Sequence, residues 1–156
     1  MLTKKPSLAK SVGRGVVAGV AGTGVMTAFQ KFVEMPITGR GPSYAPADFA
    51  EKVLPVHPAT QQGRTQLNWA THFSLGAMWG SAYGAAAHAG LRGAKAIGVV
   101  FVSVYTADVA LNTALGLYRP GSWSRQDWTV DIVDKFVQAA ATGVLYDFIL
   151  KPSAGR

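Results

Sequence analysis

The longest uncharged segment of the chain runs from Thr65 to Leu91, 27 consecutive residues without Asp, Glu, Lys or Arg. About 20 apolar residues in a helix cross the hydrocarbon core of a bilayer. A soluble helix of that length normally has a polar, charged face toward water, and this segment lacks one. The segment therefore favours a membrane-spanning helix over the alternative, a long helix of a soluble all-helical domain.

The composition supports the same interpretation. Only 15% of the residues are charged, against roughly 25% in ordinary soluble domains. The formal net charge of +7 reflects a shortage of acids and not a basic run, so the sequence lacks the dense basic face of a nucleic-acid-binding protein. The chain has no cysteine, which excludes disulfides and thiolate metal sites.

Three further apolar segments complete the predicted fold. One lies between Lys95 and Arg119 and is interrupted only by Asp108, and another lies between Arg14 and Lys31. The basic start of the chain could also belong to a signal peptide, but the apolar segment after it is glycine-rich and has no A-x-A-like cleavage site. We predict an all-α integral membrane bundle, a single domain over residues 1–156, with four transmembrane helices at about 13–33, 68–90, 94–117 and 132–150.

The connections between the predicted spans also have a pattern. The proline-rich segment 36–66 is typical of an external loop. Within it, residues 47–54 predict a short amphipathic helix, because Pro46 suits the first turn of a helix and Pro55 ends one. The loop 118–128 contains Trp123 and Trp128, side chains that are enriched at membrane interfaces.

Basic residues in the short connections predict the orientation. With the N-terminus inside, the N-terminal tail, the tight turn 90–95 and the C-terminal tail are all on the cytoplasmic side. Their basic residues are Lys4, Lys5, Lys10, Arg14, Arg92, Lys95, Lys151 and Arg156. We therefore expect a multi-pass protein of the bacterial inner membrane with both termini in the cytoplasm.

Two glycine rows predict how the helices pack. His72, Gly76, Gly80, Gly84 and His88 recur at every fourth position, so they lie along one face of a helix. A second row contains Gly15, Gly19 and Gly22. In lipid, small residues mark the faces where helix backbones approach closely. We expect the glycine row of the second span to pack against the first span within one subunit; a homodimer face is the alternative.

Asp108 is the most unusual polar residue of the predicted spans. It lies near the middle of the third span, with Asn112 one turn away. A carboxylate at that depth costs roughly 2.5–3.5 kcal/mol on insertion scales, so it needs a partner or a proton. Two interpretations stay open: a proton or cation site, and a structural hydrogen bond to a neighbouring helix.

Other polar residues lie toward the outer ends of the spans. Together with Asp108, a polar intramembrane cluster is predicted from Asn112, His72, Glu34, Asp134 and Gln138. The alternatives are an ion-paired structural cluster, a proton-linked function and a divalent metal site. No short motif has metal-ligand spacing, so we expect neither a metal nor a cofactor. We also predict a hydrated polar line from Asp108 through Asn112 toward His72, and an i, i+4 ion pair between Asp131 and Lys135.

The sequence contains no recognisable catalytic motif. It has no G-x-S-x-G sequence and no P-loop, and the glycines near residue 15 follow no predicted strand. We therefore expect that the protein is not an enzyme.

Several short motifs resemble the YagU-like family of small inner-membrane proteins. They are Gly15-Val-Val-Ala-Gly-Val20, Lys31 followed by Glu34-Met-Pro36, Asn68-Trp69, Thr71-His72 followed by Tyr83, and Leu115-Gly116-Leu117. The resemblance implies a four-helix inner-membrane protein linked to acid tolerance, with no established activity. This chain has Asp108 where the family pattern has a histidine. It also has Asp134 and Gln138 where an acid is followed four residues later by a histidine, which weakens a metal site.

These observations lead to two functional hypotheses. The first is a small polytopic membrane protein that supports pH or ion homeostasis through its polar intramembrane residues. The alternative is a structural or accessory subunit that packs against a larger membrane complex through its glycine-rich faces. The expected partners are membrane lipid and either further copies or a larger membrane complex, and we expect no nucleic acid.

Overall fold

The computed structural model describes residues 6–149, and within this range the chain is helical and contains no strand. The elements in chain order are α1 (Leu8–Phe29), a π-helical turn (Gln30–Glu34), α2 (Met35–Thr38), α3 (Ala45–Val53), α4 (Gln61–His88), α5 (Gly93–Ala114), a 3₁₀ turn (Pro120–Ser122), α6 (Arg125–Val144) and a second π-helical turn (Leu145–Ile149). The predicted all-α class is therefore confirmed.

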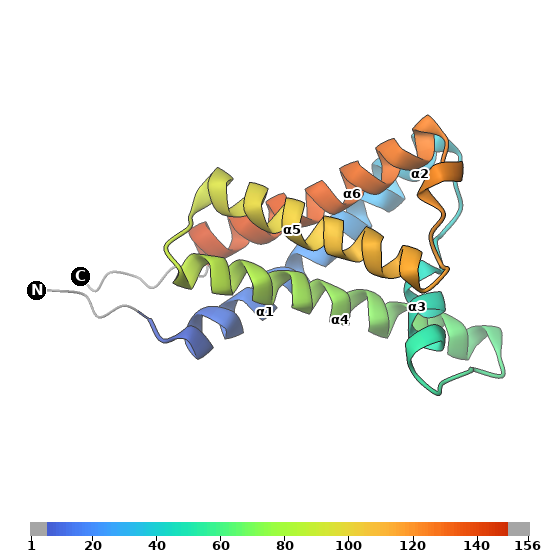
Figure 1. The fold of residues 1–156 in the computed structure, drawn as a ribbon, viewed down its shortest axis with the longest axis horizontal. Helices are drawn as coiled ribbons and strands as arrows, with labels where there is room; N and C mark the ends of the chain where they lie inside the picture. The colour runs from blue at the N-terminus through green and yellow to red at the C-terminus, as the bar shows by residue number, and fades with distance from the viewer. Residues whose placement is uncertain (1–5, 150–156) are drawn as a thin grey trace, which may run out of the picture.

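Four long helices, α1, α4, α5 and α6, form an elongated bundle (Figure 1). Successive long helices run in opposite directions. The start of α1, the connection between α4 and α5, and the end of α6 lie at one end of the bundle, which we call the inner end. Helices α2 and α3 and the connection between α5 and α6 lie at the opposite, outer end.

Two of the long helices extend beyond the predicted spans at the outer end. Helix α4 begins at Gln61 and α6 begins at Arg125, whereas the predicted spans begin at residues 68 and 132. Each start has a side-chain cap: Thr60 accepts a hydrogen bond from the Gly63 N–H, and Ser124 and Asp127 form a reciprocal capping box. Caps of this kind satisfy backbone donors that have no partner inside the helix.

The short helix of the first loop is close to its prediction. Helix α3 spans Ala45–Val53 with Pro46 in its first turn. It buries Ala47 and Ala50, and it packs against the outer part of α4. Arg64 of α4 pairs with Asp48 and Glu51 of α3.

The glycine row of α4 lies against α1, as its spacing predicts. A methyl group at Gly80 would lie 2.7 Å from the Cα of Gly19 and would also strike the carbonyl oxygen of Gly15. A methyl group at Gly84 would lie 2.8 Å from the Cα of Val12. Because carbon atoms normally approach to about 3.5–4.0 Å, only glycine permits this helix separation.

Gly22 differs from the other glycines of the α1 row. A methyl group there would meet the side chain of Thr142 and lie 2.9 Å from its backbone nitrogen. Gly22 therefore brings α1 close to α6. Gly15 and Gly19 bring another face of α1 close to α4.

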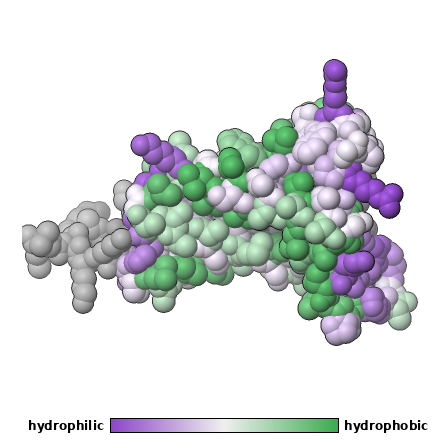
Figure 2. All heavy atoms as spheres, in the orientation of Figure 1, coloured by the Kyte–Doolittle hydropathy of each residue, from purple (hydrophilic) through white to green (hydrophobic). Residues whose placement is uncertain are grey.

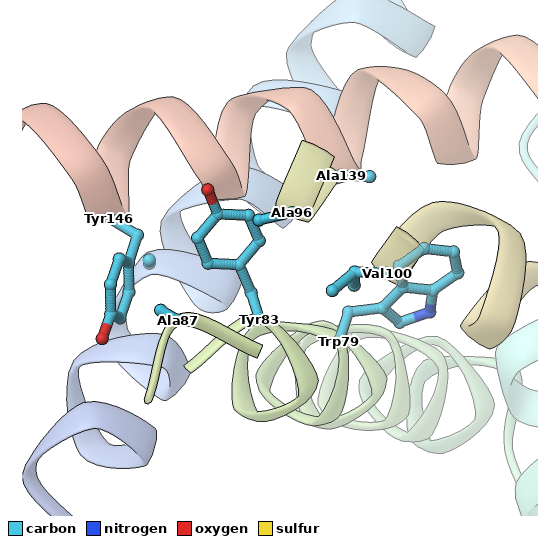
Figure 3. Close-up of a cluster of buried hydrophobic side chains, with 8 residues drawn as sticks. Trp79, Tyr83, Ala87, Ala96, Val100, Ala139 and Tyr146 are labelled. Carbon is cyan, nitrogen blue, oxygen red and sulfur yellow. The ribbon is translucent and has the colours of Figure 1, made fainter. Parts of the chain in front are cut away.

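A small aromatic core joins α4, α5 and α6 toward the inner half of the bundle (Figure 3). Tyr83 is 1% exposed, and its ring centroid lies 5.2 Å from that of Tyr146. Ala96 and Val100 of α5 pack into the same cluster. Gly143 makes room for Tyr83, because a methyl group at this position would lie 2.9 Å from the ring.

The helices differ in how well they meet the requirements of a membrane span. Among the described residues, the segment Leu8–Thr38 and helix α5 are long and apolar enough to cross a membrane. Helices α4 and α6 fall short of the same measure, because polar side chains interrupt their apolar stretches. Large apolar side chains are nevertheless exposed on α6 as well as on α1 and α5, including Val17, Val102 and Phe136, and Phe148 is exposed in the π-helical turn after α6. In Figure 2, hydrophobic residues cover much of the visible face of the bundle, and hydrophilic residues gather mainly at the outer end.

Candidate functional site

The contact between α1 and α6 contains the most deeply buried carboxyl group of the described residues. Asp134 of α6 is 6% exposed. The Nε2 atom of Gln30 lies 2.7 Å from its Oδ2 and is the single hydrogen-bond partner of the carboxyl group among residues 6–149. The Oδ1 atom is buried and has no partner in the same range. An ionised carboxylate with one empty buried oxygen is unfavourable, because each buried polar atom needs a hydrogen bond.

A row of buried polar side chains continues inward from this carboxyl group. Gln138 lies one turn along α6, and its Nε2 donates to the Thr23 hydroxyl at 2.9 Å. Thr23 is fully buried and donates in turn to the carbonyl oxygen of Gly19 at 2.9 Å. Thr142 lies one turn further along α6, is 2% exposed, and has no partner for its hydroxyl among the described residues. We call Gln30, Thr23, Asp134, Gln138 and Thr142 the α1/α6 polar seam.

The outer end of the seam coincides with a change in helix geometry. Gln30 is the first residue of the π-helical turn that follows α1, and its carbonyl oxygen accepts from the N–H of Met35, five residues later. A π turn inserts one extra residue into a helix and changes the direction of the side chains around it, and such turns are frequent at functional sites. Gln30, whose own backbone N–H still bonds within α1, lies beside Asp134 at the junction of α1 and this turn. No residue pattern in the sequence indicates it.

Asp108 belongs to a second polar group, between α5 and α6. The Nζ atom of Lys135 lies 2.6 Å from Asp108 Oδ2 and 2.9 Å from Asp131 Oδ1. Asn112 donates to Asp108 Oδ1 at 3.1 Å, and the Tyr105 hydroxyl donates to Asp131 Oδ2 at 2.9 Å. All four carboxylate oxygens therefore have a donor, which is the condition under which two ionised carboxylates are stable at low exposure.

Aromatic rings surround the ammonium group of this network. Lys135 Nζ lies 5.3 Å from the ring centroid of Tyr105 and 5.3 Å from that of Tyr118. Ring faces attract a cation at this distance. The predicted i, i+4 pair of Asp131 and Lys135 is confirmed, but it is part of a larger network that also holds Asp108.

The structure does not bring the six predicted cluster residues into one group. Asp108 bonds to Asn112 and Lys135, and among residues 6–149 no direct hydrogen bond continues from Asn112 to His72, so the hydrated line toward His72 stays a prediction. His72 Nε2 lies 3.1 Å from the Thr27 hydroxyl of α1, and Glu34 accepts from the Thr38 hydroxyl at 2.7 Å. Asp134 and Gln138 are placed in the α1/α6 polar seam instead. The physical reason is angular: α6 presents 134 and 138 to α1 but presents 131 and 135 to α5.

A third polar group closes the inner end of the bundle. Asp147 accepts from the Tyr83 hydroxyl at 2.7 Å and from the Gly93 N–H at 2.9 Å. The guanidinium of Arg92 lies 3.8 Å from its other oxygen. These contacts tie the end of α6 to the connection between α4 and α5. The sequence shows an acid near the end of the fourth span but gives no indication of its partners.

Two sets of contacts at the outer end show how residues named in the sequence analysis are used in the fold. The side chain of Asn68 accepts from the Ala47 N–H at 3.0 Å and donates to the Ser43 carbonyl at 3.1 Å, which holds α3 on α4. The rings of Trp123 and Trp128 pack edge to face with centroids 4.7 Å apart, as expected for a compact aromatic loop.

The negative charge at the start of α6 belongs to Asp127, which is part of the helix cap. The Ser124 hydroxyl and the Ser124 backbone N–H both donate to Asp127. These hydrogen bonds hold the pKa of the Asp127 carboxyl below its usual range, because they favour the charged form.

Within residues 6–149, no group of three or more His, Asp or Glu side chains is arranged to hold a metal ion. The glutamine and threonine partners of the seam are hydrogen-bonding groups without charge, so the seam can bind a proton at its one carboxyl group. Comparisons with known protein families, curated proteins and solved structures found no match for the chain.

Proposed function

We propose that the protein is a four-span membrane protein with both termini on the cytoplasmic side. The apolar lengths of Leu8–Thr38 and α5 support this, and so do the exposed apolar side chains along α6. The orientation relies on where the basic residues lie and not on their number: Lys10, Arg14, Arg92 and Lys95 are concentrated in the short inner segments, whereas Lys31, Arg40, Lys52, Arg64, Arg119 and Arg125 are spread over the longer outer ones. Reporter fusions after residues 7 and 149 should give the same side, and fusions in the connection 39–44 should give the opposite side.

We further propose that Asp134 takes up and releases a proton, and that this supports pH or ion homeostasis. The observation that carries the proposal is the buried Oδ1 atom of Asp134, which has no partner among the described residues. An ionised carboxylate would leave charge on that atom in a water-poor interface. A neutral carboxyl group carries much less charge on Oδ1, so leaving that atom without a partner costs less, and Gln30 supplies the hydrogen bond at Oδ2.

Gln30 is suited to both protonation states of Asp134. Its amide nitrogen donates to an ionised carboxylate. After a rotation of the amide, its carbonyl oxygen accepts from a protonated carboxyl group over the same 2.7 Å separation, since the two amide atoms are interchangeable in shape. Burial acts most strongly on Asp134, followed by the Gln30 hydrogen bond, and the charges of Glu34, Asp131 and Arg40 have smaller effects.

Of the two roles that the sequence left open for Asp108, its contacts favour the structural one. Its oxygens are held by Lys135 and Asn112, so the network between α5 and α6 is complete with Asp108 ionised. We infer that Asp108 fixes α5 to α6, and that proton exchange belongs to Asp134.

The accessory-subunit alternative has less support. It relied on glycine-rich faces that would be free to meet a larger complex. Gly15, Gly19, Gly76, Gly80 and Gly84 lie in the contact between α1 and α4, so these faces are used inside the subunit. The membership of the YagU-like family, and with it a link to acid tolerance, we keep as a proposal on the motifs quoted above.

Potentiometric titration of the purified full chain in lipid vesicles tests the proton site. Asp134→Asn should remove a proton that the wild type still holds at a pH where exposed aspartates are ionised, because the amide keeps the shape but cannot ionise. Asp108→Asn is the matched control: it also removes one carboxyl group, but it should leave that late-titrating proton in place. A deletion strain complemented with Asp134→Asn should lose its tolerance of acid, whereas Asp108→Asn should restore it. Equal titration curves for the wild type and Asp134→Asn would overturn the proposal.

A further inference from the structure

An apolar groove runs along the outside of the contact between α1 and α6. Its volume is about 440 Å³, and its lining residues are Val25, Phe136, Val137, Ala140, Ala141, Val144 and Leu145. Val25, Phe136 and Val144 are each nearly half exposed. The groove is therefore an open, entirely apolar surface that the described residues do not fill.

Helix geometry places two basic residues on the same face of α1, toward the inner end. Arg14 precedes Val25 by eleven residues, which is slightly more than three turns, so both lie on one face of the helix. At 1.5 Å per residue the separation is about 16 Å along the axis. Lys10 lies one turn further inward on the same face. Among residues 6–149, neither Lys10 nor Arg14 has a carboxylate partner within ion-pair distance.

This separation matches the dimensions of one membrane leaflet. The hydrocarbon core is about 30 Å thick, so the acyl chains of one leaflet reach about 15 Å from the headgroup level. A lipid whose phosphate lies at Arg14 would place its acyl chain along the groove as far as Val25. Arg14 is partly buried, and its long apolar stem allows the guanidinium to reach the headgroup level.

We propose that the groove binds one acyl chain of an anionic phospholipid of the cytoplasmic leaflet, whose phosphate pairs with Arg14 and Lys10. This inference rests on the proposed membrane placement. It explains both halves of the site: an apolar groove receives a hydrocarbon chain, and a basic pair without acidic partners selects a negatively charged headgroup. A helix from a second copy would fill the groove but would leave the basic pair without a counter-charge.

Native mass spectrometry of the full chain tests the proposal. The protein is extracted from vesicles made of equal amounts of phosphatidylglycerol and phosphatidylcholine, and the lipids that remain bound are counted. The wild type should retain phosphatidylglycerol over phosphatidylcholine by about fivefold or more, the factor that one basic side chain contributes near an anionic surface. Arg14→Gln should lower this preference by about fivefold. Lys95→Gln, a basic residue of α5 at the same end of the bundle, should leave it unchanged.

A groove variant tests the apolar half of the site. Ala141→Phe should reduce the retention of both lipids, because the larger side chain occupies the groove. Equal retention of the two lipids by the wild type, or equal losses in Arg14→Gln and Lys95→Gln, would overturn the inference. So would a dimer that carries no lipid, which would assign the groove to a second copy. A chain that fails to float with vesicles would instead refute the membrane placement, and an unchanged titration in Asp134→Asn would refute the proton site, so each failure is distinguishable.

Discussion

Replacement of Gly80 by alanine is the sharpest test of how the two central helices pack. The added methyl group would lie 2.7 Å from the Cα of Gly19, about 1 Å closer than carbon atoms normally approach. Both obstacles to the methyl group, Gly15 and Gly19, are backbone atoms, so no side-chain rotation relieves the overlap. Helices α1 and α4 must therefore separate by about 1 Å along a contact that includes Gly76 and Gly84.

The expected cost of this separation is about 1–3 kcal/mol, the usual range for an overpacked interior. Gly24→Ala provides the matched control, because nothing lies within 4 Å of a methyl group at Gly24. Alanine is the better helix former by about 0.5–1 kcal/mol, so Gly24→Ala should be neutral or slightly stabilising. Gly80→Leu should be more destabilising than Gly80→Ala.

Thermal unfolding in detergent, followed by circular dichroism, measures these differences. The unfolding midpoint of Gly80→Ala should fall below that of the wild type, and the midpoint of Gly24→Ala should not. If the two alanine variants unfolded at the same temperature, the glycine row would not hold α4 against α1, and the helix arrangement described here would be incorrect.

Two further predictions concern charged groups. Lys135→Met removes the cation shared by Asp108 and Asp131 and leaves two carboxylates at low exposure, so it should destabilise the fold by about 3 kcal/mol or more in chemical denaturation; a loss below 1 kcal/mol would argue against the network. The Asp127 carboxyl group has a lowered pKa in the folded state, so its stabilising effect is fully present above the unfolded pKa of about 3.9 and is lost as the pH falls through the lower folded value. Asp127→Asn should therefore flatten the acid limb of the stability curve, and Ser124→Ala should flatten it as well because it removes one donor; acid limbs identical to that of the wild type would contradict the capping role.

The sequence predicts the helix packing better than it predicts the polar contacts. The i, i+4 spacing of glycines indicates a close backbone contact on geometry alone, and the first two long helices are neighbours in the chain, so Gly76, Gly80 and Gly84 could be assigned to α1. The partner of Asp108 could not be assigned in this way. It depends on how each helix is rotated about its axis, and a few tens of degrees decide whether Lys135 or His72 faces it.

The role of Gln30 was missed for a different reason. Its contact with Asp134 lies at the junction of α1 and a π-helical turn, and a turn of this type has no sequence pattern comparable to a cap or a glycine row. The polar side chains of α4 and α6 bear on the predicted spans, which both helices contain. They lower the hydropathy of these helices, yet Gln138 and Asp134 are buried against α1 and not exposed to lipid.

The central claim is that Asp134 carries a proton inside the bundle, and infrared spectroscopy of the protein in lipid vesicles tests it most directly. The carbonyl stretch of a protonated carboxyl group lies above the amide bands, and labelling aspartate with ¹³C lowers its frequency, which distinguishes it from the unlabelled carbonyl stretches of glutamate and lipid esters. The account predicts such a band in the wild type at a pH where exposed aspartates are ionised, its retention in Asp108→Asn and its loss in Asp134→Asn. A wild-type spectrum without this band, or a band that disappears in Asp108→Asn and persists in Asp134→Asn, would contradict the account.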